Sequence, residues 1–520
     1  MRVLSLSSAV AAFALAVAPA VAGAASYGHG DTGVVDVSAS PGYAEGEEPL
    51  SADPLDPSHL VAVANVFQAN LPAPLDRVFG GGGFQDTRVY ASQDGGAHWT
   101  THKLDQGGLG TLTAPVPESE GFSPEFSDAF NVLNTDAASA WDRHGNAYFE
   151  SGDVHGIHHG GDEVATVWRS TDAGRTWGPA DGYAAVRVSE EGDELDRPWL
   201  AADTSGGPFD GTLYVTFETS PFVDDPPKVF VKRSSDQGRT WSATVRVDAG
   251  FYKTQFNPRQ RPVVGADGTL YIVYVEAPPT VTPFAPQNAP IHLVVARSSD
   301  GGRSFERTEI DGDVHRVTSP DEAVEGYTEM IPAIATDPAR PGRLAVAWPE
   351  ATGAGSSRIV LRWSADGGRS WSPRLDVTDD PAAKPDQHDH VTLAWLPGGA
   401  LFAGWRDRRC CGGTFDDRYQ QWVRALEPGR SGALVPGRTL EFSDGPQLGN
   451  TADGRAQLQP DEFQGLVATA QGVGLTWSQL TGTYTDLMFR RVPLRAFGLG
   501  HSSAARARPL RPRRPSARPR

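Results

Sequence analysis

Charged side chains stand in front of a series of short apolar segments, and this placement recurs along the chain. Arg197 is followed by Pro198-Trp199-Leu200, and Arg261 is followed by Pro262-Val263-Val264. Comparable places further on hold Glu329, His388 and Asp389. Carboxylates near arginines shift each other's pKa, so such a set could supply acid and base groups or bind a cation or a charged sugar. The alternative, that each residue only hydrogen-bonds neighbouring backbone, stays open.

Two histidine-rich segments call for a test of metal binding. One contains His155, His158, His159, Asp162 and Glu163, and the other contains His388, Asp389 and His390. Zinc needs three or four converging ligands, whereas adjacent side chains on a strand point to opposite faces. A catalytic zinc is therefore disfavoured, and calcium held by carboxylates and backbone carbonyls is the cation that we keep as an alternative. No other cofactor is predicted.

The two cysteines of the chain, Cys410 and Cys411, are neighbours. Adjacent Cα atoms lie about 3.8 Å apart, below the usual range for a disulfide, so a bond between these residues would fix a sharp turn. Export to an oxidising compartment favours such a bond. We predict a vicinal disulfide that could act as a rigid platform against a sugar face. Two reduced thiols, or an intermolecular link, are the alternatives.

An octet with the pattern S-x-D-x-G-x-x-W/F recurs five times and sets the architecture that must position these residues. Its copies begin at Ser92, Ser170, Ser234, Ser298 and Ser364. Glycine supplies positive φ, the aspartate accepts backbone hydrogen bonds, and the aromatic ring packs below, as in a tight hairpin turn. Alternating segments such as 228–232 and 243–247 flank the copies. The octet is therefore predicted to join the last two strands of a repeating antiparallel unit.

The octet resembles the Asp box, or BNR repeat, of the sialidase-like β-propellers. The resemblance implies an all-β propeller in which the boxes form turns on the face away from the ligand. A second repeat, of two apolar strands joined by a turn, lies upstream of each box and can be followed through seven units, the last two without a box. We predict seven four-stranded blades, with six blades as the alternative.

The N-terminal part of the propeller suggests how the ring closes. Residues 34–38 have the pattern of an outer strand but follow no box, while the seventh unit, residues 465–493, supplies only about three strands. We predict that this N-terminal strand completes the seventh blade, which removes the exposed sheet edge of a linear array.

The resemblance also implies a set of site residues. Sialidases of this fold hold the substrate carboxylate with three arginines, and use a Tyr assisted by a Glu as nucleophile and an Asp as acid/base. The implied substrate-binding residues are Arg197, Arg261 and Arg406. The implied catalytic residues are Tyr327, Glu329 and Asp389. The first unit departs from the family, because it opens with Glu48-Pro49-Leu50 rather than Arg-Ile-Pro, and seven units stand where the family has six.

Charge and termini limit the classes of partner. The formal net charge of −18 disfavours nucleic acid. Residues 1–24 have the basic start, apolar run and small-residue end of a secretory signal peptide, and no other segment could span a bilayer. The Arg/Pro-rich residues 499–520 are predicted to be a disordered tail, because they lack apolar periodicity. Residues 25–498 remain for the propeller.

These features together predict a secreted, monomeric propeller whose partner is an extracellular glycan or polysaccharide. An exo-glycosidase, for instance an exo-α-sialidase that hydrolyses the bond to an anionic sugar, is the most concrete reaction. A non-catalytic propeller that binds carbohydrate or protein is the alternative. A polysaccharide lyase with Tyr327 or His388 as its base is the third, and the fold does not separate the three.

Overall fold

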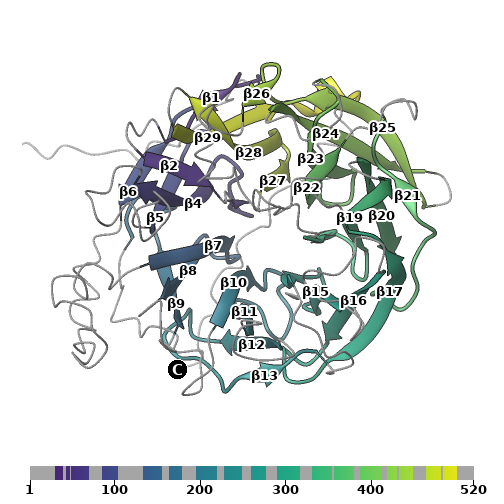
Figure 1. Ribbon diagram of the computed structural model, residues 1–520. Coiled ribbons are helices and arrows are strands. Elements are labelled where there is room, and N and C mark those ends of the chain that lie inside the picture. The colour runs from purple at the N-terminus through teal and green to yellow at the C-terminus, as the bar shows by residue number, and fades with distance from the viewer. Residues whose placement is uncertain are drawn as a thin grey trace, which may run out of the picture.

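The computed structural model is a β-propeller of seven sheets around a central axis (Figure 1). The structure describes residues 30–38, 43–46, 49–68, 85–103, 133–154, 163–177, 195–219, 228–248, 259–276, 290–316, 331–353, 356–379, 387–410, 418–429, 432–448, 464–481 and 484–499. The predicted signal peptide and most of the predicted tail lie outside these ranges. Within the described residues, no helix is both long and apolar enough to cross a membrane. The seven-blade prediction is confirmed and the six-blade alternative is wrong.

The strands follow one another from the inside of each blade to its outside. Blades 1 to 3 contain β2 (Tyr43–Gly46), β3 (Leu50–Ala52), β4 (Leu60–Gln68), β5 (Gln85–Ser92) and β6 (Thr100–Lys103); β7 (Leu133–Trp141), β8 (Ala147–Val154) and β9 (Glu163–Ser170); and β10 (Leu195–Ala202), β11 (Leu213–Thr219), β12 (Val229–Ser234) and β13 (Val245–Arg246). Blades 4 and 5 contain β14 (Arg261–Val264), β15 (Leu270–Glu276), β16 (Ile291–Ser298) and β17 (Glu306–Val314); and β18 (Ala333–Thr336), β19 (Leu344–Gly353), β20 (Ser356–Ser364) and β21 (Leu375–Asp376). Blades 6 and 7 contain β22 (His388–Trp395), β23 (Leu401–Asp407), β24 (Arg418–Pro428), β25 (Leu434–Glu441) and β26 (Gln447–Leu448); and β27 (Gly465–Thr469), β28 (Gly472–Thr481), β29 (Tyr484–Val492) and β1 (Val35–Asp36), and the 3-10 helix η3 (Leu494–Phe497) follows β29.

The hydrophobic core lies between neighbouring blades. Between blades 4 and 5, for example, Val273 and Val275 of β15 belong to the same buried cluster as Val346 and Trp348 of β19. The second strand of a blade has neighbours on both faces, and every residue of β11 is buried. A blade alone would expose both apolar faces to water, so its stability depends on the blades beside it.

The Asp boxes form the predicted turns after the third strands. In the fifth box, Ser364 Oγ donates to Asp366 Oδ1 at 2.8 Å, and Gly368 N–H donates to Ser364 Oγ at 2.9 Å. The Trp371 indole donates to the Gly368 carbonyl at 3.1 Å. The Ser370 hydroxyl and backbone N–H donate to the Asp366 carboxylate and lower its pKa to about 2. Each box is thus held by its own side chains.

The boxes also pack against the preceding blade. Gly302 of the fourth box has φ of 77°, and a Cβ at this position would lie 3.3 Å from Tyr214 of β11 in blade 3. Gly174 of the second box would bring a Cβ to 2.9 Å from Ala91 of β5 in blade 1. The box glycine therefore serves both the left-handed backbone and a close interblade contact.

The ring closes as the sequence predicted. The strand β1 pairs with β29, with Val35 opposite Phe489 and Asp36 opposite Met488 (Figure 1). A second fastening lies beside it, where the buried Glu45 carboxylate accepts from Tyr90 Oη at 2.5 Å and from the Leu487 N–H at 3.1 Å. The first and last parts of the propeller therefore share a sheet and a buried hydrogen-bond network.

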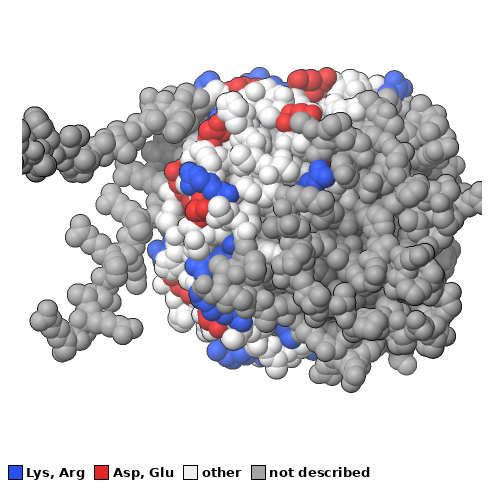
Figure 2. Space-filling model, turned by 90° about the vertical axis from the view of Figure 1, so that its left-hand side faces the viewer, with Lys and Arg blue, Asp and Glu red and all other residues white. Residues whose placement is uncertain are grey.

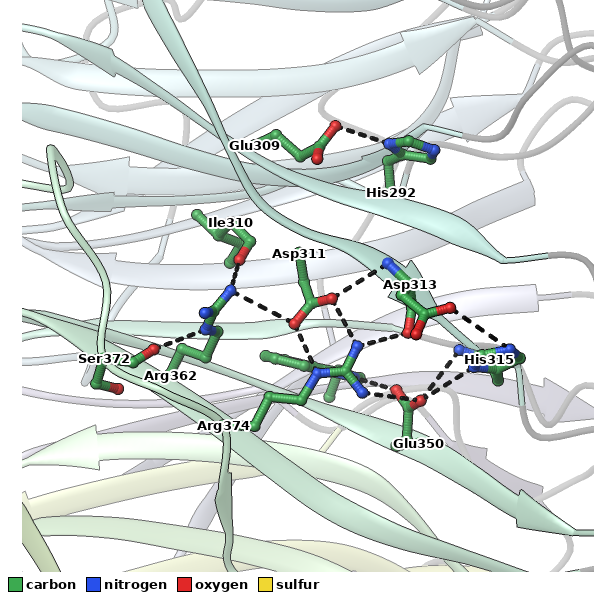
Figure 3. A network of polar contacts seen from close by, with 11 residues as sticks. His292, Glu309, Ile310, Asp311, Asp313, His315, Glu350, Arg362, Ser372 and Arg374 are labelled. Atoms are coloured by element: carbon green, nitrogen blue, oxygen red, sulfur yellow. Dashed lines mark hydrogen bonds and ion pairs between the residues drawn. The ribbon is translucent and has the colours of Figure 1, made fainter.

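A polar network joins blades 4 and 5 near their outer strands (Figure 3). Arg374 donates to both oxygens of Asp311 on β17, at 2.6 and 2.8 Å, and to Glu350 Oε1 on β19 at 3.3 Å. The Trp348 indole donates to the other Glu350 oxygen at 2.8 Å. Although burial acts to raise the pKa of Asp311, the side-chain hydrogen bonds from Arg374 lower it below its usual value. The network adds an ionic link to the apolar contact between these blades.

We predict that removing residues 26–40 will lower the melting temperature by several degrees, since blade 7 loses its outer strand and β29 becomes an exposed edge. Thermal unfolding followed by circular dichroism would measure the change. Removing residues 505–520, most of the predicted tail, is the control and should have no effect. An unchanged melting temperature after the N-terminal deletion would show that the ring is closed by other contacts.

We predict that Asp311→Asn will lower the free energy of unfolding at pH 7 by about 1–2 kcal/mol, since the paired Arg374 side chain is 36% exposed and the ionic link is partly screened. Because the folded-state pKa of Asp311 lies below 3.8, its ionic stabilisation is present above about pH 4 and is lost as the pH falls below this value. Urea unfolding at several pH values should show the two proteins converging in acid. A difference that stays constant down to about pH 2.5 would exclude an ionic contribution.

Candidate functional site

The innermost strands of the blades begin at one end of the central channel, and we call this end the mouth. Three residues at the mouth share an unusual backbone conformation. Among the described residues, five other than glycine have positive φ, and two of these, Ala173 and Gln237, belong to Asp-box turns. The other three are Arg197, Arg259 and His390, with φ of 54°, 55° and 52°. Left-handed φ costs about 1 kcal/mol or more at a residue with a side chain, and such strain gathers at functional sites. The three residues therefore mark the mouth as a candidate site.

The strand register shows that these three positions are equivalent. In each of these blades, one residue of the innermost strand pairs with the fourth residue of the second strand. These pairs are Trp199 with Thr216, Arg261 with Val273, and Thr392 with Gly404. Arg197, Arg259 and His390 each lie two residues before the first member of such a pair. The pairing is shifted by a β-bulge between Asp196 and Trp199 and between Asp389 and Thr392. Bulges of this kind re-aim side chains at the end of a strand.

The mouth of blade 6 contains a fully buried carboxylate with three cationic or ionisable neighbours. Arg406 Nε donates to Asp389 Oδ1 at 2.6 Å, and Arg408 Nη1 donates to Asp389 Oδ2 at 2.6 Å. His390 Nδ1 lies 2.9 Å from Asp389 Oδ1. Although burial opposes ionisation, the charges of Arg406 and Arg408 hold the pKa of Asp389 well below its usual range. Asp389 is therefore an ionised anchor that orients two arginines, and is unsuited to donate a proton.

A second carboxylate lies on the other face of the same blade. Asp407 Oδ2 lies 3.2 Å from His388 Nε2, and it accepts from the Trp405 indole at 2.9 Å and from Arg409 Nε at 2.8 Å. His388 Nδ1 lies 2.6 Å from the Ser357 carbonyl of blade 5. Although burial acts to raise the pKa of Asp407, hydrogen bonds from His388 and Arg409 lower it well below its usual value. The contact between His388 and Ser357 links blade 6 to blade 5.

Another charged group of the mouth lies at the border of blades 3 and 4. Glu218 Oε2 accepts from the Arg259 N–H at 2.7 Å, and Glu218 Oε1 lies 3.7 Å from Arg197 Nε. Gln260 Nε2 donates to the Arg197 carbonyl at 2.6 Å. The Arg261 guanidinium stacks on Trp199, 3.9 Å from the ring centroid. The side chains around Arg197 are all buried, namely those of Glu218, Arg259, Gln260 and Arg261.

The structure brings together some of the predicted site residues. Asp389 and Arg406 form a direct ion pair, and Arg197 and Arg261 meet at one blade border through Gln260. The two groups lie on opposite sides of the central axis, in the blades that begin with β10 and β22 (Figure 1). Tyr327 and Glu329 lie outside the described residues, so their roles stay predictions.

One expected equivalence is wrong. The sequence aligned Arg261-Pro262 with Arg197-Pro198, whereas the register makes Arg259 the counterpart of Arg197 and places Arg261 opposite Val273, beside Trp199 in the neighbouring blade. The proline after each arginine was misleading, since Pro198 lies within the bulge of blade 3, whereas Pro262 lies in the regularly paired part of β14 in blade 4. Glu218, Arg259 and Arg408 were not predicted from the sequence. Only Arg408 had a signal, its spacing of two from Arg406 at the end of β23.

The cysteine and metal predictions remain open. Cys410 is disulfide-bonded, but Cys411 lies outside the described residues, so the vicinal bond stays a prediction. His155, His158, His159 and Asp162 also lie outside. His388 and His390 contact different carboxylates, Asp407 and Asp389, and the described part of the chain holds no group of three His, Cys, Asp or Glu side chains that could bind a metal.

Comparison with known proteins agrees with this architecture. The model of the BNR repeat-like domain family matches residues 147–403, from β8 to β23. The chain contains a BNR repeat-like domain. Its seven blades and five Asp boxes are consistent with a sialidase-like BNR propeller.

Several known proteins are similar to this propeller. A xyloglucanase from a Paenibacillus species is 25% identical over 260 residues, which cover 45% of the propeller chain and 21% of the xyloglucanase. Among solved structures, the GH93 α-L-arabinofuranosidase of Fusarium graminearum with arabinobiose has a TM-score of 0.41 at 13% identity, covering 80% of this chain and 99% of its own. The NanB sialidase from Streptococcus pneumoniae has a TM-score of 0.41 at 9% identity, covering 87% of this chain and 69% of its own. The propeller thus spans about a fifth of its sequence relative.

We predict that Asp389→Asn will lower the free energy of unfolding by about 3 kcal/mol or more, because it leaves two buried arginines without their shared anion. Urea unfolding at pH 7 would measure the change. The control is Asp376→Asn, which breaks the exposed pair with Arg358 and should cost about 1 kcal/mol or less. Equal effects of the two substitutions would contradict the anchoring role of Asp389.

Proposed function

We propose that this propeller is a secreted glycosidase that hydrolyses an extracellular polysaccharide at the mouth where β10, β14 and β22 begin. The observation that carries the proposal is the repeated strained backbone at Arg197, Arg259 and His390, each beside a buried carboxylate. A protein retains strain of this kind where it positions groups for binding or chemistry. The similarity to a xyloglucanase supports a polysaccharide as the substrate.

The charges at the mouth favour a neutral sugar. Arg406 and Arg408 both contact Asp389, and Arg197 lies beside Glu218. Arginines that already face carboxylates exert a weaker field on an anionic ligand than three unopposed arginines would. On the side of the molecule shown in Figure 2, basic and acidic side chains are likewise interspersed. We therefore place a neutral polysaccharide such as xyloglucan ahead of the anionic sugar that the sequence suggested.

The acid and base groups of a glycosidase must have different proton affinities. Asp389 and Asp407 both have a lowered pKa, so within the described part of the mouth they serve as anions. We assign the proton transfers to Glu329, with Tyr327 as its partner, as the resemblance to the sialidases implies. If these residues are not catalytic, the buried anions fit the second candidate function, a propeller that binds glycan without cleaving it.

The decisive experiment incubates the mature protein with xyloglucan, neutral arabinan, α-sialosides and acidic polysaccharides. New reducing ends, and absorbance from an unsaturated product, would report hydrolysis and lyase activity separately. We expect hydrolysis of a neutral polysaccharide, and a loss of about 10²- to 10⁴-fold in rate for Glu329→Gln, as for a missing general base. Tyr327→Phe should also slow the reaction.

The control is Glu306→Gln, which changes an exposed carboxylate of the outer strand β17 and should leave the rate unchanged. Hydrolysis that survives both Glu329→Gln and Tyr327→Phe would remove these residues from the mechanism. Glycan binding without any product would favour the non-catalytic propeller. An unsaturated product would favour the lyase.

A further inference from the structure

A pair of buried glutamines lies between blades 6 and 7, next to the arginines of the mouth. Gln464 Nε2 donates to Gln421 Oε1 at 2.9 Å across the blade border. Gln421 is 1% exposed and Gln464 is 8% exposed. Gln464 directly precedes β27, the innermost strand of blade 7, so the pair lies at the mouth of the channel.

The strand register places this pair in line with the charged cluster. Asp389, Arg406 and Gln421 lie directly opposite one another on β22, β23 and β24, so their side chains leave the sheet on one face. That face turns toward blade 7, because Tyr419, two residues before Gln421, donates to the Ser478 carbonyl of β28 at 2.5 Å. The Arg406 guanidinium lies 5.3 Å from the centroid of the Tyr419 ring.

The amide pair has two unused hydrogen-bonding groups. Gln421 Nε2 and Gln464 Oε1 are buried and have no hydrogen-bond partner among the described residues. A buried amide atom without a partner costs about 1–3 kcal/mol, so two such atoms in one hydrogen-bonded pair favour occupation by a polar ligand group or by water. The pair offers one donor and one acceptor. If both amides were turned over, the bond between them would reverse and the pair would still offer one donor and one acceptor.

A hydroxyl group can accept one hydrogen bond and donate another, so its chemistry matches an unpaired donor and an unpaired acceptor together. A carboxylate could accept from the donor but would repel the amide oxygen, and a methylene group would satisfy neither. The pair therefore matches a sugar hydroxyl better than an acidic group.

We propose that Gln421 and Gln464 form a subsite that recognises one hydroxyl of a neutral sugar beside Arg406 and Asp389. This inference rests on the proposed function for the site as a whole, but it concerns recognition rather than cleavage. The subsite selects sugars that carry a hydroxyl at this point over their deoxy analogues. Sites built to bond a substrate hydroxyl discriminate strongly against the analogue that lacks it.

Binding to the mature protein tests the subsite without any need for turnover. The probes are xyloglucan oligosaccharides and the methyl glycosides of glucose, xylose, galactose and arabinose, with affinity measured by calorimetry and saturation-transfer NMR. For the tightest binder, one monodeoxy analogue should bind at least about 10-fold more weakly than the parent. The double variant Gln421→Met with Gln464→Met should bind the parent at least about 10-fold more weakly, and should no longer distinguish it from that analogue.

Thermal unfolding separates recognition from a structural role. The double variant removes two unpaired buried atoms, so its melting temperature should equal or exceed that of the wild type. The control is Gln479→Met, a half-buried glutamine of β28 that should leave sugar affinity unchanged. A lower melting temperature with unchanged affinity would overturn the proposal and show that buried water fills the site. Failure of the wild type to bind any probe would also overturn it. Hydrolysis with unaltered binding in the double variant would leave the proposed function standing and remove only the subsite.

Discussion

The structure depends on burial of each blade against both of its neighbours. The cluster that contains Val273, Val275, Val346 and Trp348 lies between two sheets, and every residue of β11 is buried. Because the apolar core is shared across blade borders, an open array would expose one sheet face at each end. The pairing of β1 with β29 joins the two ends of the propeller and lets every blade keep two neighbours.

This closed ring explains where charge and strain are tolerated. In the box turns, the polar groups of serine, aspartate and glycine hydrogen-bond one another, so these turns need few polar contacts with other parts of the molecule. At the mouth, by contrast, Arg197, Arg259 and His390 hold left-handed backbone, and Asp389 is ionised although it is fully buried. Such costs persist only where many surrounding contacts fix the geometry, and blades packed on both sides provide those contacts.

Turns formed by residues close together in the sequence could be predicted from the sequence, whereas contacts across blade borders could not. The octets predicted their turns, because serine, aspartate and glycine act within eight residues of one another, and the unpartnered 34–38 segment predicted the closure. Arg259 was missed because the Arg-Pro pairs at 197–198 and 261–262 suggested an equivalence, whereas the strand register offsets the equivalent positions by two residues. Glu218, Gln421 and Gln464 looked like ordinary strand-end residues. Their significance comes from partners 41 or 43 residues away in the next blade.

The proposed function requires that a glycan binds at the mouth, where the innermost strands begin, and not at the Asp boxes. A crystal structure of the mature protein soaked with a xyloglucan oligosaccharide tests this most directly. We predict sugar density at the mouth, with one hydroxyl between the amides of Gln421 and Gln464 and the ring beside Arg406. Sugar bound at the box turns or along the outer strands, with an empty mouth, would contradict it.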